Sequence, residues 1–433
     1  MDHHKFWHFI SGYDIYMPEL QPYAQDMNAK LVRMFDFRPG WGYSRIMPCT
    51  QWRGTPQNSD WDWSTVDKLT DAIYGVGAEP LYCLGDVGGT RDMCYAERVP
   101  AGMPCSEGVP DINQYAQYCA EWIRHFKQTG KPVKFYEIIN ENAHYWSGSS
   151  TRLRTYIELF SACARAMRAE NPNILLGQDS ITDGSLNEQL STGEDLDFIS
   201  YHSYAIRPTE DITRAFQNAE TKGINVALQT RQQWYNARGK WLPVLCTEMN
   251  LDWDPDIRIQ KMEGAVWLAL VFRAMMLQEF HYNVYFEFTG KPGDLGLGMI
   301  RAEDCLRFYP YYVNWMMGRN ISVEDAVFEA NTTSDDVKVI AWNHQGKLNI
   351  LLICKVDVAQ TVNLQGVTGQ LEAIWIDNTI PYTNPALQTA ILNAENPITL
   401  NGYAVMLLQS TQSTPVSPSP LLLLALLAYF LLG

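Results

Sequence analysis

The stretch INQYAQYCAEWIRHFKQTGKPVKFYEIIN, residues 112–140, contains one helix followed by one strand. The amphipathic run Ile112–Gln128 predicts the helix, and Gly130 with Pro132 ends it before the apolar, β-rich run Lys134–Asn140. A strand that is apolar on both faces is typical of a parallel sheet covered by helices. This unit therefore predicts an α/β fold.

The same alternation extends over about the first 300 residues. Seven further apolar runs predict strands, at Phe6–Ser11, Lys30–Phe37, Glu79–Leu84, Ile174–Gln178, Leu196–Tyr201, Leu242–Thr247 and Tyr282–Phe288. Four further stretches predict helices between them, at Ser64–Tyr74, Thr151–Glu170, Arg214–Ala237 and Met262–Phe280. Eight such units indicate a closed (β/α)8 TIM barrel. A doubly wound open sheet is the alternative, weakened because no Gly-x-Gly-x-x-Gly or Walker loop follows the first strand.

The chain of 433 residues is longer than one domain core, which stops growing at about 250–300 residues. From about residue 318 the pattern changes to short strands, such as VKVIAWNHQ (337–345) and KLNILLICKV (347–356), separated by turn residues. We expect a barrel over residues 1–317, a small all-β sandwich over 318–409, and a Ser/Thr/Pro linker with an apolar tail over 410–433.

The apolar tail LLLLALLAYFLLG, residues 421–433, would span only about 20 Å as a helix, against about 30 Å for a bilayer core. Its layout matches either a cleaved lipid-anchor signal or a short retained anchor. Both predict an extracellular or cell-surface protein attached to the membrane through this tail. The first residues, MDHHKFWHFISGYD, lack the pattern of a secretory signal, so either export takes another route or a leader is missing from this chain.

The charge balance and the cysteine pattern argue against nucleic acid, metal ions and cofactors as ligands. With 33 Lys and Arg against 48 Asp and Glu, the formal charge is −15, which argues against a nucleic-acid partner. Cys94 and Cys105 lie in a polar, Gly/Pro-rich loop and predict a disulfide if the chain is secreted. The nine cysteines form no Cys-x-x-Cys pair, and no His-x-His follows a strand, so we expect neither a metal nor a cofactor.

Ionisable residues follow several predicted strands, at the end of a barrel where active sites lie. Asn140-Glu141 follows the fourth strand, and Thr247-Glu248 follows the seventh. Two facing carboxylates at a barrel mouth are what glycoside hydrolysis needs. Asn187-Glu188 and Thr209-Glu210 repeat these dipeptides in helix-like or loop-like surroundings, so the preceding β-rich run distinguishes the candidate pair.

Three runs carry a family resemblance: KFYEIINE (134–141), LDFISYHSY (196–204) and LPVLCTEMN (242–250). With the β-domain that follows, the chain resembles the clan A glycoside hydrolases, and most of all glycoside hydrolase family 39. The resemblance covers most of residues 5–317. It implies a retaining enzyme that cleaves a β-linked neutral oligosaccharide or polysaccharide by double displacement through a covalent glycosyl-enzyme.

The resemblance also implies roles for the residues at the fourth and seventh strands. Glu141 would be the acid/base, Glu248 the nucleophile, and Asn140 the ligand of the sugar 2-hydroxyl. Double displacement requires the two carboxyl groups to lie about 5–5.5 Å apart. We also expect the like charge and burial to raise the pKa of Glu141.

Three further residues are candidates for the same site. By the resemblance, Tyr204 would donate a hydrogen bond to Glu248 and help to keep it ionised. His202 would contact the sugar or the carboxylate pair, with a structural histidine as the alternative. Arg33 would lie beneath Glu248 and lower its pKa, with an ion pair in the barrel floor as the alternative.

Tryptophans in loop-like segments are candidate platforms for a sugar ring, although each could equally pack its loop. Those singled out for substrate are Trp146 and Trp253, with Trp41, Trp52, Trp61 and Trp63 as further candidates. Where relatives have a Trp-rich eighth strand this chain has VYFEFTG, with Phe286 or Phe288 as the replacement. A non-catalytic carbohydrate-binding surface protein on the same barrel is the alternative function.

Overall fold

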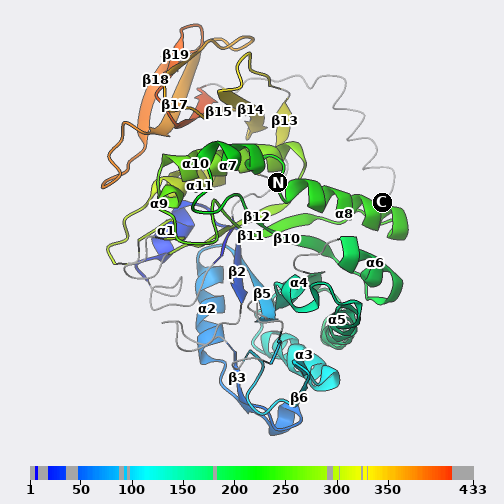
Figure 1. Ribbon diagram of the computed structural model, residues 1–433. Helices are drawn as coiled ribbons and strands as arrows, with labels where there is room; N and C mark the ends of the chain where they lie inside the picture. The colour runs from blue at the N-terminus through cyan, green and yellow to red at the C-terminus, as the bar shows by residue number, and fades with distance from the viewer. Residues whose placement is uncertain are drawn as a thin grey trace.

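The structure is a computed structural model that describes residues 5–7, 18–35, 47–86, 92–94, 98–178, 183–289, 296–301, 303–322, 325–328 and 330–411. Within these residues, eight parallel strands close into a barrel, in the order in which they follow along the chain (Figure 1). They are β1 (Lys5–Trp7), β2 (Leu31–Phe35), β5 (Glu79–Asp86), β8 (Phe135–Asn140), β9 (Leu175–Gln178), β10 (Phe198–Tyr204), β11 (Val244–Asn250) and β12 (Tyr282–Phe286).

Helices follow the strands and cover the outside of the barrel (Figure 1). The helices after the eight strands are α1 (Gln21–Asp26), α2 (Ser64–Gly75), α3 (Ile112–Gln128), α5 (Ser150–Glu170), α6 (Asp183–Thr192), α8 (Ile224–Arg238), α10 (Met262–Leu277) and α11 (Tyr309–Asn320). Additional helices lie in the connections, namely α4 (Asn142–Trp146), α7 (Ile212–Ala219) and α9 (Ile257–Gln260). The predicted (β/α)8 barrel is thus confirmed, and the open-sheet alternative is wrong.

Strand side chains alternate between the barrel interior and the helices, as a pleated strand requires. In β5, Leu81 and Cys83 pack inside the barrel with residues such as Leu245, whereas Tyr82 and Leu84 pack outward in the main core. Both faces of the strands are therefore buried, which explains their continuous apolar runs.

One predicted helix is in fact two. The run Arg214–Ala237 is divided into α7 and α8, with Gly223 between them at φ +78°. A Cβ at this position would lie 2.8 Å from Cε2 of Tyr201, so both the backbone conformation and the close approach require glycine. The helical periodicity on the two sides of Gly223 conceals this break.

Gly177 in β9 lies under the ring of Phe198 on the neighbouring strand, and a Cβ there would lie 1.9 Å from Cε2 of that ring. We expect Gly177→Ala to lower the free energy of unfolding by about 1–3 kcal/mol, because the barrel interior has no room for the methyl group. Urea denaturation followed by circular dichroism measures this. Gly75→Ala is the matched control, since nothing lies within 4 Å of its added Cβ, and equal stability of both variants would contradict the packing argument.

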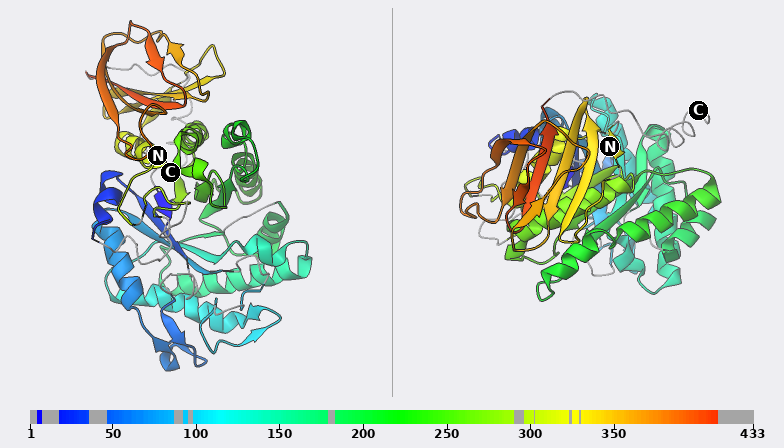
Figure 2. Two further views of the ribbon diagram at one scale, coloured as in Figure 1. Left: turned by 60° about the vertical axis from the view of Figure 1, so that its left-hand side comes forward. Right: turned by 90° about the horizontal axis from the view of Figure 1, so that it is seen from above.

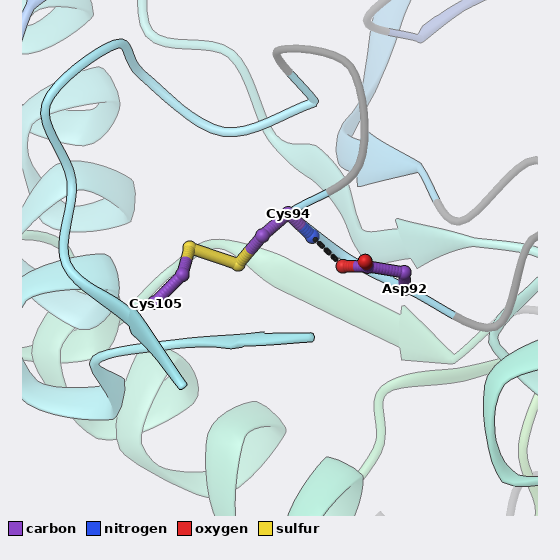
Figure 3. Close-up of a disulfide and its surroundings, with 3 residues drawn as sticks. All are labelled: Asp92, Cys94 and Cys105. Carbon is purple, nitrogen blue, oxygen red and sulfur yellow. Dashed lines mark hydrogen bonds between the residues drawn. A yellow bond between two sulfur atoms is a disulfide. The ribbon is translucent and has the colours of Figure 1, made fainter. Parts of the chain in front are cut away.

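The connection between β5 and α3 carries the predicted disulfide. Cys94 and Cys105 are bonded, and the backbone N–H of Cys94 donates to Oδ1 of Asp92 (Figure 3). A short hairpin of β6 (Cys105–Ser106) and β7 (Val109–Pro110) continues from the second cysteine. The disulfide prediction is therefore confirmed.

The C-terminal part is all-β, as predicted, and lies over α10 and α11 at one end of the molecule (Figures 1 and 2). Its larger sheet has the order β13-β14-β15-β20-β17-β18, and a second sheet pairs β16 with β19. These strands are β13 (Ala326–Phe328), β14 (Val337–His344), β15 (Lys347–Cys354), β16 (Gln360–Val362), β17 (Gln370–Asp377), β18 (Gln388–Asn393), β19 (Ile398–Leu400) and β20 (Ala404–Ser410).

The larger sheet buries both of its faces. One face, which includes Val339 and Leu352, forms a core with the β16–β19 sheet. The other face, which includes Trp342 and Leu351, joins the core of the barrel helices and contacts α10. Nε of Arg273 on α10 donates to the carbonyl of Val339 at 2.9 Å, and this bond joins the two parts. The division at residues 317, 409 and 433 stays a prediction.

The predicted attachment to a membrane is corrected. Within the described part of the chain, no helix is both long and apolar enough to cross a bilayer. The tail at residues 421–433, on which the extracellular or cell-surface placement depended, lies outside the described residues. The predicted extracellular or cell-surface placement is therefore contradicted, because no helix of the described residues could provide the membrane attachment on which it rested.

Candidate functional site

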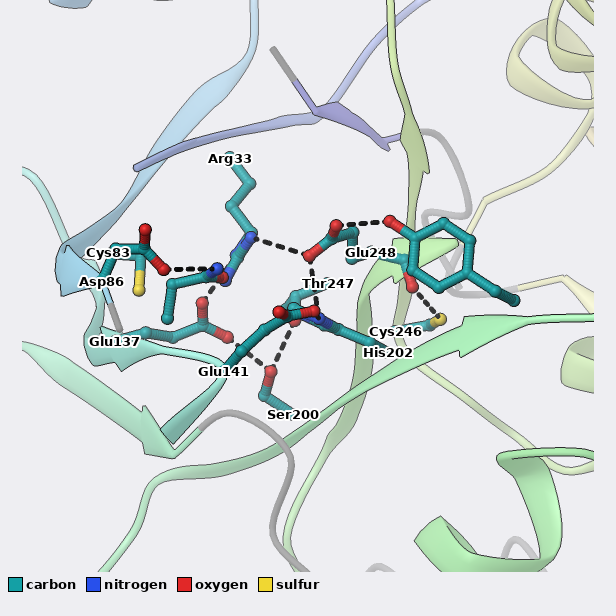
Figure 4. Close-up of polar contacts among 12 residues, drawn as sticks. Arg33, Cys83, Asp86, Glu137, Glu141, Ser200, His202, Cys246, Thr247 and Glu248 are labelled. Carbon is teal, nitrogen blue, oxygen red and sulfur yellow. Dashed lines mark hydrogen bonds and ion pairs between the residues drawn. The ribbon is translucent and has the colours of Figure 1, made fainter. Parts of the chain in front are cut away.

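The candidate residues lie at the carboxyl ends of neighbouring barrel strands (Figure 4). β8 ends at Asn140, and Glu141 follows it in the left-handed backbone region at φ +50°. β11 carries Glu248, which is opposite His202 of β10 in the sheet register. Tyr204 is two residues further along β10, on the same face of the strand.

The two carboxyl groups lie close together. One carboxylate oxygen of Glu141, one of Glu248 and a ring nitrogen of His202 all lie within 4.8 Å of one another. Such a close approach of one oxygen from each carboxyl group is compatible with the separation of about 5–5.5 Å between the two groups that double displacement requires. The sequence-predicted pair is thus brought together at the barrel mouth.

His202 lies between the carboxylates. Its Nδ1 is 2.8 Å from Oε2 of Glu248 and 3.3 Å from Oε1 of Glu141. A second histidine, His144 on α4, places its Nδ1 3.5 Å from Oε2 of Glu141. Of the two alternatives, the geometry agrees with a contact to the carboxylate pair, and His144 is an additional neighbour that sequence analysis missed.

The hydroxyl of Tyr204 donates a hydrogen bond to Oε1 of Glu248. Burial, together with the charge of Glu248, raises the pKa of Tyr204 well above its usual value. The phenol therefore stays protonated and remains a donor. A donor to the charged form of a carboxylate favours that form.

Arg33 joins the floor of the barrel to the site. Its buried guanidinium donates from Nε to Oε2 of Glu137 (2.6 Å) and from Nη2 to Oδ1 of Asn140 (2.9 Å). Its Nη1 lies 3.7 Å from Oε2 of Glu248. Both alternatives for Arg33 are therefore present together, an ion pair in the floor and a cation beneath Glu248.

Glu137 is a further member of this network that sequence analysis missed. It is fully buried in β8 and also accepts a hydrogen bond from Ser200, whose hydroxyl lies 2.5 Å from that of Thr247. The signal that could have revealed it is a single acidic residue within the apolar strand FYEIIN. Buried charges in proteins are usually paired, so such a residue indicates a buried cation nearby.

The pKa values of the pair correct one expectation. Burial raises the pKa of Glu248, although His202 and Arg33 act in the opposite direction. Burial would also raise the pKa of Glu141, but the hydrogen bond from His202 and the charges of His202, His144 and Arg33 outweigh it, so the pKa is lowered. The expected raised pKa of Glu141 is wrong, because two histidines and an arginine compensate its charge.

The tryptophan candidates occupy different positions. Helix α4 begins directly after Glu141 and ends at Trp146, which is half-buried. Trp253 lies on the loop after β11 and is 55% exposed. Trp61 and Trp63 stack on each other at 5.2 Å, and Trp52 is buried, and all three contact side chains of α3, so they pack this loop region against that helix. Trp41 lies outside the described residues.

The end of β12 places Phe286, rather than Phe288, beside the site. The ring of Phe286 packs edge-on against that of Tyr204 at 6.2 Å, whereas Phe288 is fully buried in the main core. Asn250 of β11 is a further residue missed by sequence analysis, and its Nδ2 donates to the carbonyl of Phe286. Phe286 is therefore the remaining aromatic candidate on the eighth strand.

One group of described residues has an arrangement that could hold a metal ion, and it consists of Glu141, His202 and Glu248. These are the carboxylate pair and the histidine between them. A metal ion held there would replace the contacts of His202 with the two carboxylates, and the expectation of no metal stays a prediction.

The chain resembles known proteins in structure rather than in sequence. No family model matches the sequence, and no curated protein matches it. Among solved structures, a GH39 β-xylosidase from Caulobacter crescentus has a TM-score of 0.65 at 14% identity, over 94% of this chain and 95% of that chain. An α-L-arabinofuranosidase from Thermotoga maritima, in complex with arabinose, has a TM-score of 0.65 at 13% identity, over 94% and 96% of the two chains.

A GH30 endoxylanase from Clostridium papyrosolvens is also similar, with a TM-score of 0.60 at 12% identity over 95% and 97% of the chains. At these identities the similarity concerns the fold, and it spans the barrel and the β-domain together. For the fold, the resemblance proposed from the three strand runs is confirmed. The chain therefore shares the fold of these solved glycoside hydrolases over nearly its whole length.

Proposed function

We propose that this protein is a retaining glycoside hydrolase that cleaves a β-linked neutral glycan. The observation that carries the proposal is the short distance between the carboxyl groups of Glu141 and Glu248, at the strand ends where barrel enzymes hold their active sites. Solvated surface carboxylates would not be expected to converge from two strands on one histidine. The fold similarity supports the same reaction class.

In the proposed mechanism, the carboxylate of Glu248 attacks the anomeric carbon, and the glycosidic bond breaks as a glycosyl ester forms. The carboxyl group of Glu141 gives its proton to the leaving oxygen. In the second step Glu141 removes a proton from water, and the resulting hydroxide displaces Glu248 from the sugar. Tyr204 and Arg33 stabilise the carboxylate of Glu248 before attack and after release.

The proposed substrate class is supported by the net charge of the protein and by the similar solved structures. The formal charge of −15 disfavours anionic polymers and nucleic acid. The solved structures with this fold include proteins named as a β-xylosidase and an endoxylanase, and we propose a glycan substrate for this chain as well. Phe286 places an aromatic ring beside Tyr204, and Trp146 and Trp253 are proposed as further platforms because they follow Glu141 and β11 in the chain.

The pKa directions predict the pH dependence of kcat/KM. Attack requires ionised Glu248, whose pKa is raised, and proton transfer requires protonated Glu141, whose pKa is lowered. The active form is therefore the minor one of the two singly protonated forms of the pair. Its population is nearly constant between the two pKa values, falls as pH decreases below the pKa of Glu141 and falls as pH rises above that of Glu248, so we expect a bell-shaped profile with an acidic maximum.

Initial rates of aryl glycoside hydrolysis from about pH 3 to about pH 8 check this profile. Glu188→Gln, which changes the Asn-Glu dipeptide on α6, should leave the profile unchanged. A rate that continues to rise above neutral pH would contradict the assignment of Glu141 as the acid.

The function is tested by time-resolved proton NMR during hydrolysis of 4-nitrophenyl β-glycosides of xylose and glucose. We expect the β-anomer to form first and then to mutarotate. If the α-anomer forms first, double displacement is excluded. Binding of these sugars with no release of nitrophenol would instead favour a non-catalytic carbohydrate-binding protein.

A further inference from the structure

The side-chain amide of Asn140 is held on two sides by charged groups that allow it one orientation. Its Oδ1 accepts from Nη2 of Arg33 (2.9 Å), and its Nδ2 donates to Oδ1 of Asp86 (3.3 Å). A guanidinium only donates hydrogen bonds and a carboxylate only accepts them. If the amide were flipped, its NH2 group would face the guanidinium of Arg33 and its oxygen would face the carboxylate of Asp86, and neither pair could form a hydrogen bond. The amide nitrogen carries two hydrogens, which leaves one N–H of Asn140 for another acceptor.

The negative charge of Asp86 is compensated by the positive charge of Arg98. Asp86 ends β5, opposite Asn140 in the sheet register, and its Oδ2 lies 2.7 Å from Nη1 of Arg98. The two side chains are only 7% and 5% exposed. Because buried charges require partners, Arg98 allows a carboxylate to stay beside Asn140. Neither Asp86 nor Arg98 was a candidate in the sequence.

Arg98 belongs to the segment that the disulfide closes, between Cys94 and Cys105 (Figure 3). The same connection is fastened to the protein elsewhere, since the backbone N–H of Trp52 donates to the carbonyl of Ala101 at 2.6 Å. A closed loop has fewer conformations than an open one, so the disulfide lowers the entropic cost of holding Arg98 against Asp86.

We propose that Asp86 and Arg98 are positioning residues that direct the remaining N–H of Asn140 to the 2-hydroxyl of the bound sugar, and that the Cys94–Cys105 disulfide keeps Arg98 in place. This inference rests on the proposed function, because it concerns how the same site holds its substrate. A hydrogen bond to the 2-hydroxyl strengthens in the transition state, so its loss lowers kcat more than it changes KM.

The test compares two substrates, the 4-nitrophenyl β-glycoside that the wild-type protein cleaves fastest and its 2-deoxy counterpart. On the first, Arg98→Ala and Asp86→Asn should each lower kcat by about tenfold to a hundredfold, the effect of a small misplacement near the reacting centre. On the 2-deoxy substrate both should stay within about threefold of wild type, since Asn140 has no hydroxyl to hold. Arg98→Lys, which keeps a cation, should recover part of the loss. Equal losses on both substrates would overturn the proposal.

The role of the disulfide is tested by the double variant Cys94→Ser, Cys105→Ser. It should show the same substrate-dependent loss as Arg98→Ala, and adding Arg98→Ala to it should cause no further loss. The matched control is Arg53→Ala, which removes an Arg–Asp pair of the same 2.7 Å length in which both side chains are more than half exposed. Unchanged activity of the double variant would overturn the role given to the disulfide.

A measurement that needs no turnover separates this inference from the proposed function. In protein with 15N-labelled asparagine, the side-chain amide signals of Asn140, assigned from the Asn140→Asp spectrum, should shift in Arg98→Ala and in the double serine variant. They should not shift in Arg53→Ala. If the wild type cleaved no glycoside, the function would fail while these shifts still supported the positioning. Signals that do not move in Arg98→Ala would overturn the positioning whether or not the protein is active.

Discussion

Glu248→Gln is expected to lower kcat on every aryl glycoside by about 10⁴-fold or more, as removal of the nucleophile does in other hydrolases. The amide has nearly the same shape as the carboxylate and can still accept the hydrogen bond from Tyr204, so the site should keep its structure. It cannot form the glycosyl ester, and turnover should therefore be lost. Steady-state kinetics measure the loss, and circular dichroism with thermal melting shows that the variant is folded.

Glu210→Gln is the matched control, because Thr209-Glu210 repeats the dipeptide of the seventh strand outside the barrel strands. Glu210 is paired with Arg214 on the surface, and its change should leave kcat near the wild-type value. Wild-type kcat in Glu248→Gln would remove this residue from the mechanism, even if the protein proved to be a hydrolase.

Glu141→Ala should separate substrates by their leaving groups. With 4-nitrophenyl or alkyl glycosides, whose leaving oxygen needs a proton, we expect kcat/KM to fall by about 10²–10⁴-fold. With 2,4-dinitrophenyl glycosides the first step needs little help, so nitrophenolate should appear in a burst and then slowly. Added azide should restore turnover and give a β-glycosyl azide, which NMR and mass spectrometry detect.

The control for this experiment is Glu188→Gln, which alters the repeated Asn-Glu dipeptide on α6 and an exposed pair with Arg154. It should show neither the leaving-group dependence nor azide rescue. If Glu141→Ala lost the same factor on good and poor leaving groups, the residue would have a structural role rather than acid/base catalysis.

The fold could be predicted from the sequence because each barrel strand is buried on both faces. Such strands appear as short apolar runs, and all eight predicted strands overlap the observed ones. α6 was missed because the run Asp183–Thr192 contains only Leu186 and Leu190 as large apolar residues. The break at Gly223 was missed because its cause is the ring of Tyr201, which is distant in sequence.

The site could be predicted only in part. Residues at the carboxyl ends of the apolar runs, such as Glu141 and Glu248, have a local signal, and the barrel topology brings them together. Arg98 has none, because its contact with Asp86 depends on the path of a long connection. The pKa of Glu141 depends on where two histidines place their ring nitrogens, which no spacing in the sequence specifies.

Helix α10 has a consequence for how the chain can be divided. Its sequence, MEGAVWLALVFRAMML, is apolar around nearly its whole circumference, and it is enclosed by the barrel on one side and by β14, β15 and β20 on the other. Ending the chain after α11 would expose the apolar side of α10 that these strands cover, and large exposed apolar patches favour aggregation. We therefore expect the barrel and the β-domain to unfold together, and an exchange of the β-domain to require compensating polar changes on α10.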